Sequence, residues 1–313
     1  MSRAFVFPGQ GSQAVGMGRE LAAAFGEARH VFQEVDEALS QNLSKLMFEG
    51  PEDSLTLTEN AQPALMAVSV AVIRVLEGQG KMDLAKTASF VAGHSLGEYS
   101  ALAAAGTFSL ADTARLLKLR GQSMQKAVPV GIGAMAALLG SEYEQAKEIA
   151  ALAAEDQVCE AANDNGAGQV VVSGHKEAVE RAMKIAAEKG VKRAVLLPVS
   201  APFHCALMQP AADAMAEALS NVSMNAPTVP LVANVMAAAV TDPEIIRDLL
   251  VRQVTGTVRW REGVLYMKEQ GVSQLVEIGA GKVLSGLAKR IDKELTGIAV
   301  GNPADIDAFL ASL

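Results

Sequence analysis

The sequence predicts an α/β fold with a parallel sheet and a small second sheet inserted into it. Short apolar runs, beginning with residues 4–7, alternate with segments of helical spacing. From about residue 124 the order becomes strand, helix, strand, strand, helix, strand, which is the split βαβ or ferredoxin-like arrangement. A chain of 313 residues also exceeds the usual size of a single core. We therefore expect a large α/β domain of residues 1–123 and 199–313, and a small ferredoxin-like subdomain of residues 124–198.

Each expected element follows from its own pattern. Residues 4–7 are an apolar strand that ends in a glycine-rich turn, and residues 89–92 are a second strand of the same kind. Apolar residues at helical spacing predict the helices of the large domain at residues 61–76, 110–125, 237–248 and 257–270. The same criteria predict strands at residues 133–139, 158–162, 169–173, 193–199 and 275–279, and small-subdomain helices at residues 142–154 and 176–189.

Composition excludes several classes of protein. A net charge of −8 argues against general nucleic-acid affinity. The two cysteines lack the spacing of a disulfide scaffold or a zinc site, so no metal is expected. The longest apolar stretch, residues 64–73, is too short to span a bilayer, and no signal-peptide core precedes Pro8. We expect a cytoplasmic protein without membrane contact.

The pentapeptide Gly93-His94-Ser95-Leu96-Gly97 lies between an expected strand and an expected helix. A strand that turns sharply into a helix at Gly-x-Ser-x-Gly is typical of the nucleophile elbow of an α/β-hydrolase-like domain. The alternative is an ordinary junction at which the hydroxyl only caps the helix. The first interpretation predicts acyl chemistry through Ser95.

A serine nucleophile needs a nearby base, and the chain offers four histidines. His30 lies in a polar helical segment, His175 begins a small-subdomain helix, and the side chain of His94 should leave the elbow in a different direction from Ser95. His204 follows two prolines at the exit of an expected strand, in a loop at the end of the sheet. It is the best candidate for the base, against the alternative of a structural loop histidine.

Six motifs in the same order give the chain a strong resemblance to a known family. They are Gly9-Gln10-Gly11-Ser12-Gln13, residues 59–65, residues 93–99, Arg120-Gly121, Pro202-Phe203-His204 and residues 252–260. The chain resembles the malonyl-CoA:acyl carrier protein transacylases of fatty acid synthesis, which are related to the acyltransferase domains of polyketide synthases. The resemblance extends from Phe5 to about Gly281 and includes the inserted subdomain.

The resemblance implies a role for each matched residue. Ser95 would attack the thioester of malonyl-CoA, and His204 would take its proton and return it to the departing CoA thiol. The main-chain carbonyl of Gln253 would orient His204 in place of an acid, giving a Ser–His dyad. The oxyanion hole would be formed at Leu96 and Gln10.

The same resemblance implies how the substrate is selected. The Arg120 guanidinium would bind the free carboxylate of the malonyl group, although without the family it is only a basic residue on an amphipathic helix. Phe203 matches the malonyl-selective members and would leave little room for a branched acyl group. The chain departs from the family at Ala167, where a proline is common, and we expect a looser loop there. The remaining acid candidates are weak and are expected to be helix caps or surface carboxylates, namely Asp213, Asp242 and Asp248.

The expected partners are malonyl-CoA and an acyl carrier protein, whose own phosphopantetheine arm accepts the acyl group. We expect the chain itself to need no cofactor and to be a monomer. An acidic carrier requires a local basic surface. Two sets of residues are candidates: Lys189, Lys192 and Arg193, or Lys282, Lys289 and Arg290. Two other functions stay open: a serine esterase or thioesterase, which would transfer the acyl group to water, and a non-catalytic acyl-CoA or carrier-binding module.

Overall fold

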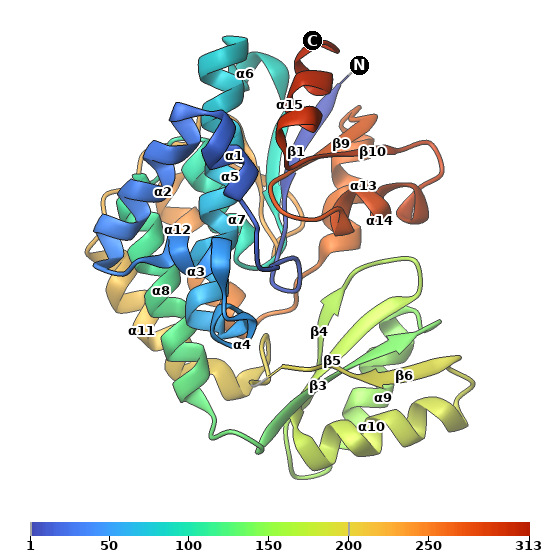
Figure 1. Cartoon of the computed structure of the whole chain (residues 1–313). Coiled ribbons are helices and arrows are strands. Elements are labelled where there is room, and N and C mark those ends of the chain that lie inside the picture. The colour runs from blue at the N-terminus through green and yellow to red at the C-terminus, as the bar shows by residue number, and fades with distance from the viewer. Residues whose placement is uncertain (1, 200) are drawn as a thin grey trace.

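The computed structural model describes residues 2–199 and 201–313 and has a six-stranded sheet at its centre (Figure 1). All neighbouring strands of this sheet run parallel except the last pair, which is antiparallel. In spatial order the strands are β10 (Thr296–Val300), β9 (Gln274–Ile278), β1 (Arg3–Phe7), β2 (Phe90–Gly93), β7 (Leu231–Val232) and β8 (Ala239–Val240).

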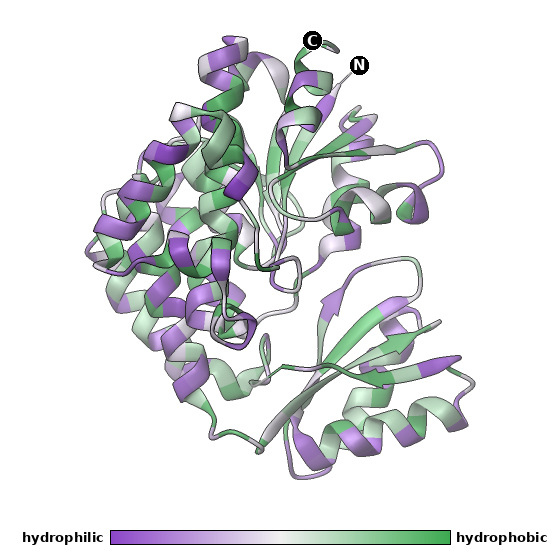
Figure 2. Ribbon diagram, in the orientation of Figure 1, coloured by the Kyte–Doolittle hydropathy of each residue, from purple (hydrophilic) through white to green (hydrophobic). Residues whose placement is uncertain are grey.

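Both faces of this sheet are buried, because side chains alternate along each strand. In β1, Phe5 and Phe7 pack on one face in the largest core, while Ala4 and Val6 pack on the other face with Trp260. Figure 2 shows the strands as mostly hydrophobic, with hydrophilic residues along the outer sides of the surrounding helices. The helices of the large domain are α1 (Arg19–Ala24), α2 (Gly26–Leu39), α3 (Leu43–Glu49), α4 (Glu52–Thr56), α5 (Thr58–Gly80), α6 (Leu84–Thr87), α7 (Gly97–Ala104), α8 (Leu110–Ala127), α11 (Gln209–Ser220), α12 (Pro243–Thr255), α13 (Trp260–Glu269), α14 (Val283–Ile291) and α15 (Pro303–Leu310), with a 3-10 turn, η1 (Ala206–Met208).

Helix α5 is the central helix of the largest core. Among the described residues it is the one helix long and apolar enough to cross a membrane by length and composition, but 83% of its most apolar 18-residue window is buried inside the molecule. Its apolar residues therefore pack against the rest of the protein, chiefly against α2 and α8.

The inserted unit is a four-stranded antiparallel sheet in the order β4-β5-β3-β6, covered by two helices (Figure 1). This order confirms the ferredoxin-like arrangement expected from the sequence. The predicted boundaries of the subdomain at residues 124 and 198 stay a prediction. The elements are β3 (Gly133–Leu139), α9 (Tyr143–Ala154), β4 (Cys159–Asp164), β5 (Gln169–His175), α10 (Lys176–Glu188) and β6 (Arg193–Leu196).

The small sheet is joined to the large domain by more than the two chain crossings. Val258 donates a backbone hydrogen bond of 2.9 Å to the carbonyl of Ala162 and accepts one of 2.9 Å from the N–H of Asp164. The Asp164 carboxylate also forms an ion pair with Arg261, with 2.9 Å between Oδ2 and Nε. Strand β4 is thus fixed to the segment between α12 and α13.

The helix predicted at residues 237–248 is wrong in its first half. Residues 239 and 240 form β8, which pairs antiparallel with β7. The turn before it places Ala237 in the left-handed region, at φ 53°, where its N–H bonds the carbonyl of Ala233. Helix α12 begins only at Pro243, where the side chain of Asp242 accepts hydrogen bonds from the first turn. Pairing with β7 here outweighs the helix propensity of the alanines.

Candidate active site

Ser95 lies at the tight turn between β2 and α7 and has a left-handed backbone, with φ 53°. The two glycines of the motif are required by close packing. A Cβ on Gly93 would lie 1.9 Å from the carbonyl carbon of Gly97, and a Cβ on Gly97 would lie 2.2 Å from the carbonyl oxygen of Phe7. The pentapeptide thus forms the sharp strand-to-helix turn expected of a nucleophile elbow.

The elbow is held from the side by Asn234, which follows β7. Its Oδ1 accepts a hydrogen bond of 2.8 Å from the N–H of Ser95, and its Nδ2 donates one of 2.6 Å to the carbonyl of Gly93. Asn234 is 4% exposed, so these groups have no access to compensating water. Sequence reasoning missed Asn234, because a single asparagine after a strand forms no motif.

His204 is brought to Ser95 from a distant loop, as the sequence predicted. Its Nε2 lies 2.8 Å from Ser95 Oγ, and its Nδ1 lies 2.8 Å from the main-chain carbonyl of Gln253 in the last turn of α12. A carbonyl can only accept, so Nδ1 carries the proton and Nε2 accepts from the serine hydroxyl. The contact that the family resemblance implied for Gln253 is therefore present.

The His204 imidazole is in the neutral form, which can accept a proton. Burial lowers the pKa of His204 to about 3, the Arg120 charge acts in the same direction, and the hydrogen bond to Gln253 opposes both. The ring is consequently neutral over the physiological pH range.

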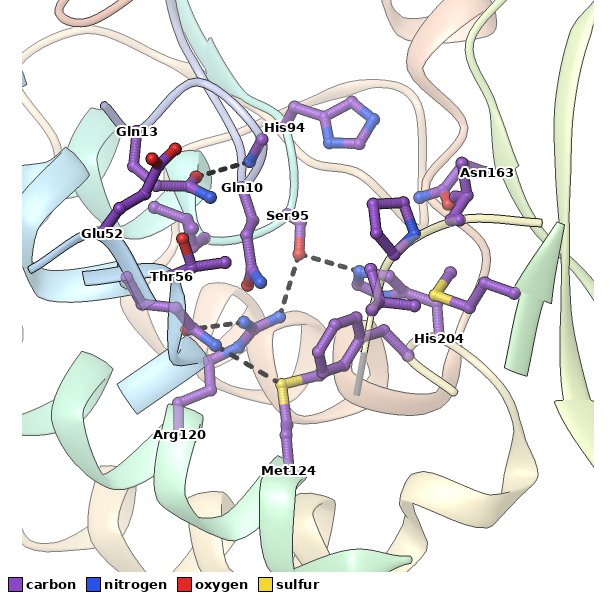
Figure 3. Close-up of a pocket in the computed structure, with 18 residues that line it drawn as sticks. Gln10, Gln13, Glu52, Thr56, His94, Ser95, Arg120, Met124, Asn163 and His204 are labelled. Carbon is purple, nitrogen blue, oxygen red and sulfur yellow. Dashed lines mark hydrogen bonds between the residues drawn. The ribbon is translucent and has the colours of Figure 1, made fainter. Parts of the chain in front are cut away.

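Arg120 is completely inside the molecule, at 1% exposure, and is not on a solvated helix face. Its Nη1 donates to Gln62 Oε1 at 2.8 Å, and its Nη2 donates to Gln253 Oε1 at 2.8 Å and to Ser95 Oγ at 3.2 Å. The next residue, Gly121, allows α8 to approach α5 closely, since a Cβ there would lie 2.5 Å from the Cα of residue 59. The result is a buried cation directly beside the serine hydroxyl (Figure 3).

Gln10 and Leu96 line the same pocket as the serine. Among the hydrogen bonds of the described residues, neither backbone N–H has an acceptor, as an oxyanion hole requires. The side chain of Gln10 accepts a hydrogen bond of 2.8 Å from the Thr58 hydroxyl, which in turn accepts one of 3.0 Å from Gln62 Nε2. A continuous hydrogen-bonded chain therefore connects the Gln10 loop to Arg120 through Gln62.

These groups open into one cavity of about 490 Å³ between the large domain and the small sheet. The labelled polar side chains surround Ser95 on several sides (Figure 3), and apolar side chains form much of the remaining lining. Phe203 lines this pocket together with Met124, Met135, Leu197 and Val199. A cavity of this size and character suits an acyl thioester with an extended arm.

The other histidines and acidic residues considered from the sequence do not join the dyad. His94 Nε2 bonds Asn165 Oδ1 at 2.8 Å, and His175 Nδ1 accepts from the N–H of Val158. His30 is exposed. The carboxylates of Asp213, Asp242 and Asp248 bond Gln209, the first turn of α12 and Arg252, respectively. Within the described residues, no group of three or more His, Cys, Asp or Glu could hold a metal ion.

The loop at Ala167 has its own conformation. Ala167 adopts φ 53°, between two glycines that also have positive φ. Proline is locked near −65°, so the conformation seen here is incompatible with a proline at this position.

The profile of the acyl transferase domain family matches residues 4–298. The chain belongs to this family. It is 49% identical over 307 residues to the malonyl CoA-acyl carrier protein transacylase of Escherichia coli K12, covering 98% of each chain.

Solved structures of family members agree with the fold in detail. The acyl-carrier-protein S-malonyltransferase of Bartonella henselae superposes with a TM-score of 0.97 at 60% identity, over 100% of this chain and 99% of the other. A malonyl-transacylase in complex with its type II polyketide acyl-carrier protein superposes with a TM-score of 0.96 at 45% identity, over 100% of both chains. The chain is thus an acyltransferase with the two-part fold of this family.

Proposed function

We propose that this acyltransferase moves the malonyl group from malonyl-CoA to the phosphopantetheine thiol of an acyl carrier protein, through a malonyl ester on Ser95. The observation that carries the proposal is the position of Ser95 Oγ, 2.8 Å from His204 Nε2 and 3.2 Å from Arg120 Nη2. A nucleophile between a neutral base and a buried cation suits an acyl donor that carries a negative charge.

In the first half-reaction Ser95 Oγ forms a bond to the thioester carbonyl carbon while its proton passes to His204 Nε2. The negative charge that develops on the carbonyl oxygen is stabilised by the N–H groups of Leu96 and Gln10. When the carbon–sulfur bond breaks, the CoA sulfur takes the proton from His204. The carbonyl of Gln253 stabilises the transient imidazolium by accepting from Nδ1, in the position that an aspartate occupies in a triad.

Arg120 supplies selectivity for a carboxylated acyl group. Its guanidinium is held by Gln62 and Gln253, and its Nε has no partner within the described residues. The malonyl carboxylate then binds to a cation that is already oriented. Phe203 lines the same pocket and would disfavour a branch on the acyl chain.

In the second half-reaction the carrier's thiol replaces CoA and attacks the malonyl ester, with His204 again moving the proton. Lys192, Arg193, Lys289 and Arg290 are exposed and offer positive charge to an acidic carrier, whereas Lys189 already pairs with Glu148 at 2.8 Å. The cytoplasmic location and the monomeric state stay predictions from the sequence.

The decisive experiment is an intact-mass measurement after incubation with malonyl-CoA, followed by addition of carrier protein. We expect one malonyl adduct on the wild-type chain, none on Ser95→Ala, and discharge onto the carrier. His204→Ala should lose most of the adduct, because the serine then has no base. Its matched control, His30→Ala, should form the adduct as the wild type does, because His30 is exposed on α2 and outside the pocket. Release of free malonate without carrier would instead identify a hydrolase, and absence of any adduct would refute the covalent route.

A further inference from the structure

Glu98 is a buried carboxylate that none of the steps above uses. It lies in the first turn of α7, immediately after Gly97 of the elbow, and is 1% exposed. Its Oε2 accepts a hydrogen bond of 2.6 Å from Gln253 Nε2, and its Oε1 has no partner within the described residues. A buried carboxylate with an unpaired oxygen is unfavourable unless a nearby cation compensates its charge.

Arg120 is that cation, and the side-chain amide of Gln253 bridges the two charged groups. Gln253 Oε1 accepts from Arg120 Nη2 at 2.8 Å, and Gln253 Nε2 donates to Glu98 Oε2. The amide dipole therefore has its oxygen toward the cation and its N–H toward the anion. Among the described residues no carboxylate contacts Arg120 directly, and its Nε keeps a free N–H.

We propose that Glu98 balances the charge of Arg120 while the site is empty and takes up a proton when the substrate's free carboxylate binds to Arg120. This proposal rests on the proposed function, because it requires a carboxylated acyl group at Arg120. The empty cluster has one cation and one anion, and the loaded cluster would have one cation and two anions in a buried site. A proton from solvent, bonded to a Glu98 oxygen, restores neutrality, and no other bond changes.

The groups packed around Glu98 leave it as the one that changes charge. Burial raises the pKa of Tyr99, so its hydroxyl is neutral, and Asn234 offers only a neutral N–H. His204 lies beyond Gln253 and is neutral as well. Burial raises the pKa of Glu98 to about 7, against the opposing effects of the Gln253 hydrogen bond and the Arg120 charge. A second anion nearby raises that pKa further.

Proton uptake can be measured with the full-length Ser95→Ala protein, which binds but cannot be acylated at this position. Calorimetric titration at pH 8 in two buffers of different ionisation enthalpy gives the number of protons taken up. We expect about one proton per malonyl-CoA bound and none with acetyl-CoA, which also controls for the CoA phosphates. The affinity for malonyl-CoA should fall by up to about tenfold per pH unit above pH 7, while that for acetyl-CoA stays constant.

Adding Glu98→Gln to this protein should abolish both the proton uptake and the pH dependence. The matched control is Glu277→Gln, since Glu277 is 0% exposed and also has one unpartnered oxygen, but it bonds Ser285 away from the pocket. That control should keep full proton uptake. If Glu98→Gln does not fold, the comparison of malonyl-CoA with acetyl-CoA on the parent protein still decides.

Equal proton uptake with the two thioesters, or unchanged uptake in Glu98→Gln, would overturn the proposal. Its failure is distinguishable from failure of the proposed function. A malonyl adduct on Ser95 without proton uptake would contradict only the role of Glu98. Absence of the adduct would contradict the function itself.

Discussion

Gln253 contacts Ser95 and His204 with different groups of the same residue. Its side-chain Nε2 donates a hydrogen bond of 2.8 Å to the main-chain carbonyl of Ser95, and its own carbonyl accepts one of 2.8 Å from His204 Nδ1. Its Oε1 also supports Arg120. One residue thus fixes the relative positions of nucleophile, base and cation, and its backbone and side-chain contributions can be separated by mutation.

Gln253→Ala should keep the His204 contact, which is to the backbone, and lose the contacts to Ser95 and Arg120. We expect kcat/KM for malonyl-CoA to fall about 10- to 100-fold, with a smaller fall for acetyl-CoA, because the cation loses a partner. Steady-state kinetics with both thioesters measures this. Gln209→Ala is the control, as the Gln209 side chain bonds Asp213 on the exposed face of α11. Equal losses for the two substrates would contradict the role of the side chain at Arg120.

Arg120→Ala should reduce the preference for malonyl-CoA over acetyl-CoA by about 100-fold or more, since a buried carboxylate without its partner is strongly disfavoured. Arg120→Lys should be intermediate, because lysine keeps the charge but not the planar pair of donors. Competition assays with mixed thioesters report the ratio. Arg115→Ala, on the same helix but exposed and paired with Asp112, should leave it unchanged. An unaltered ratio in both Arg120 variants would show that selectivity resides elsewhere.

Asn234→Ala should destabilise the elbow, since it leaves the N–H of Ser95 and the carbonyl of Gly93 without their partner. We expect the free energy of unfolding to fall by about 2 kcal/mol. kcat should fall while KM changes little, because Ser95 shifts relative to His204. Urea denaturation and steady-state kinetics test the two parts. Asn221→Ala, at the exposed end of α11, is the control. If Asn234→Ala loses no more stability and activity than this control, the role of Asn234 in holding the elbow is contradicted.

Glu98→Gln should change how stability depends on pH. The pKa of Glu98 is about 7 in the folded protein against an ordinary value of 4.5, so the folded state binds more protons between these values. The wild type therefore loses stability as pH rises from 4.5 through 7, and the variant does not. The stability of the variant relative to wild type should increase by about 3 kcal/mol between pH 4 and pH 8. A difference that does not vary with pH would show that Glu98 has an ordinary pKa.

Much of the site could be predicted because its reacting residues lie in short motifs that can be recognised in the sequence. Ser95 lies in a pentapeptide with its own turn geometry, and the motifs around Arg120 and His204 have a fixed order along the chain. Glu98 and Asn234 were missed for physical reasons. A glutamate in an exposed first turn and a glutamate buried under an elbow have the same sequence pattern, and only the packing of α7 distinguishes them.

The error in the first half of the helix predicted at residues 237–248 has a similar cause. The alanines there favour a helix locally, whereas the pairing of β8 with β7 is a contact that no short window contains. The start of α12 was predictable, because Asp242 before Pro243 is the usual combination of an N-cap with proline at the first helical position.

The bonds between β4 and the segment at Val258 bear on how substrates enter. They attach the small sheet to the large domain at a third point besides its two chain crossings, and this attachment restrains movement of one wall of the pocket relative to the other. We therefore expect the pocket between them to keep nearly the same width during turnover. In the proposed reaction a thioester on a nucleotide and a thiol on a protein would then use the same entrance, and what they must share is a thin arm long enough to reach the serine.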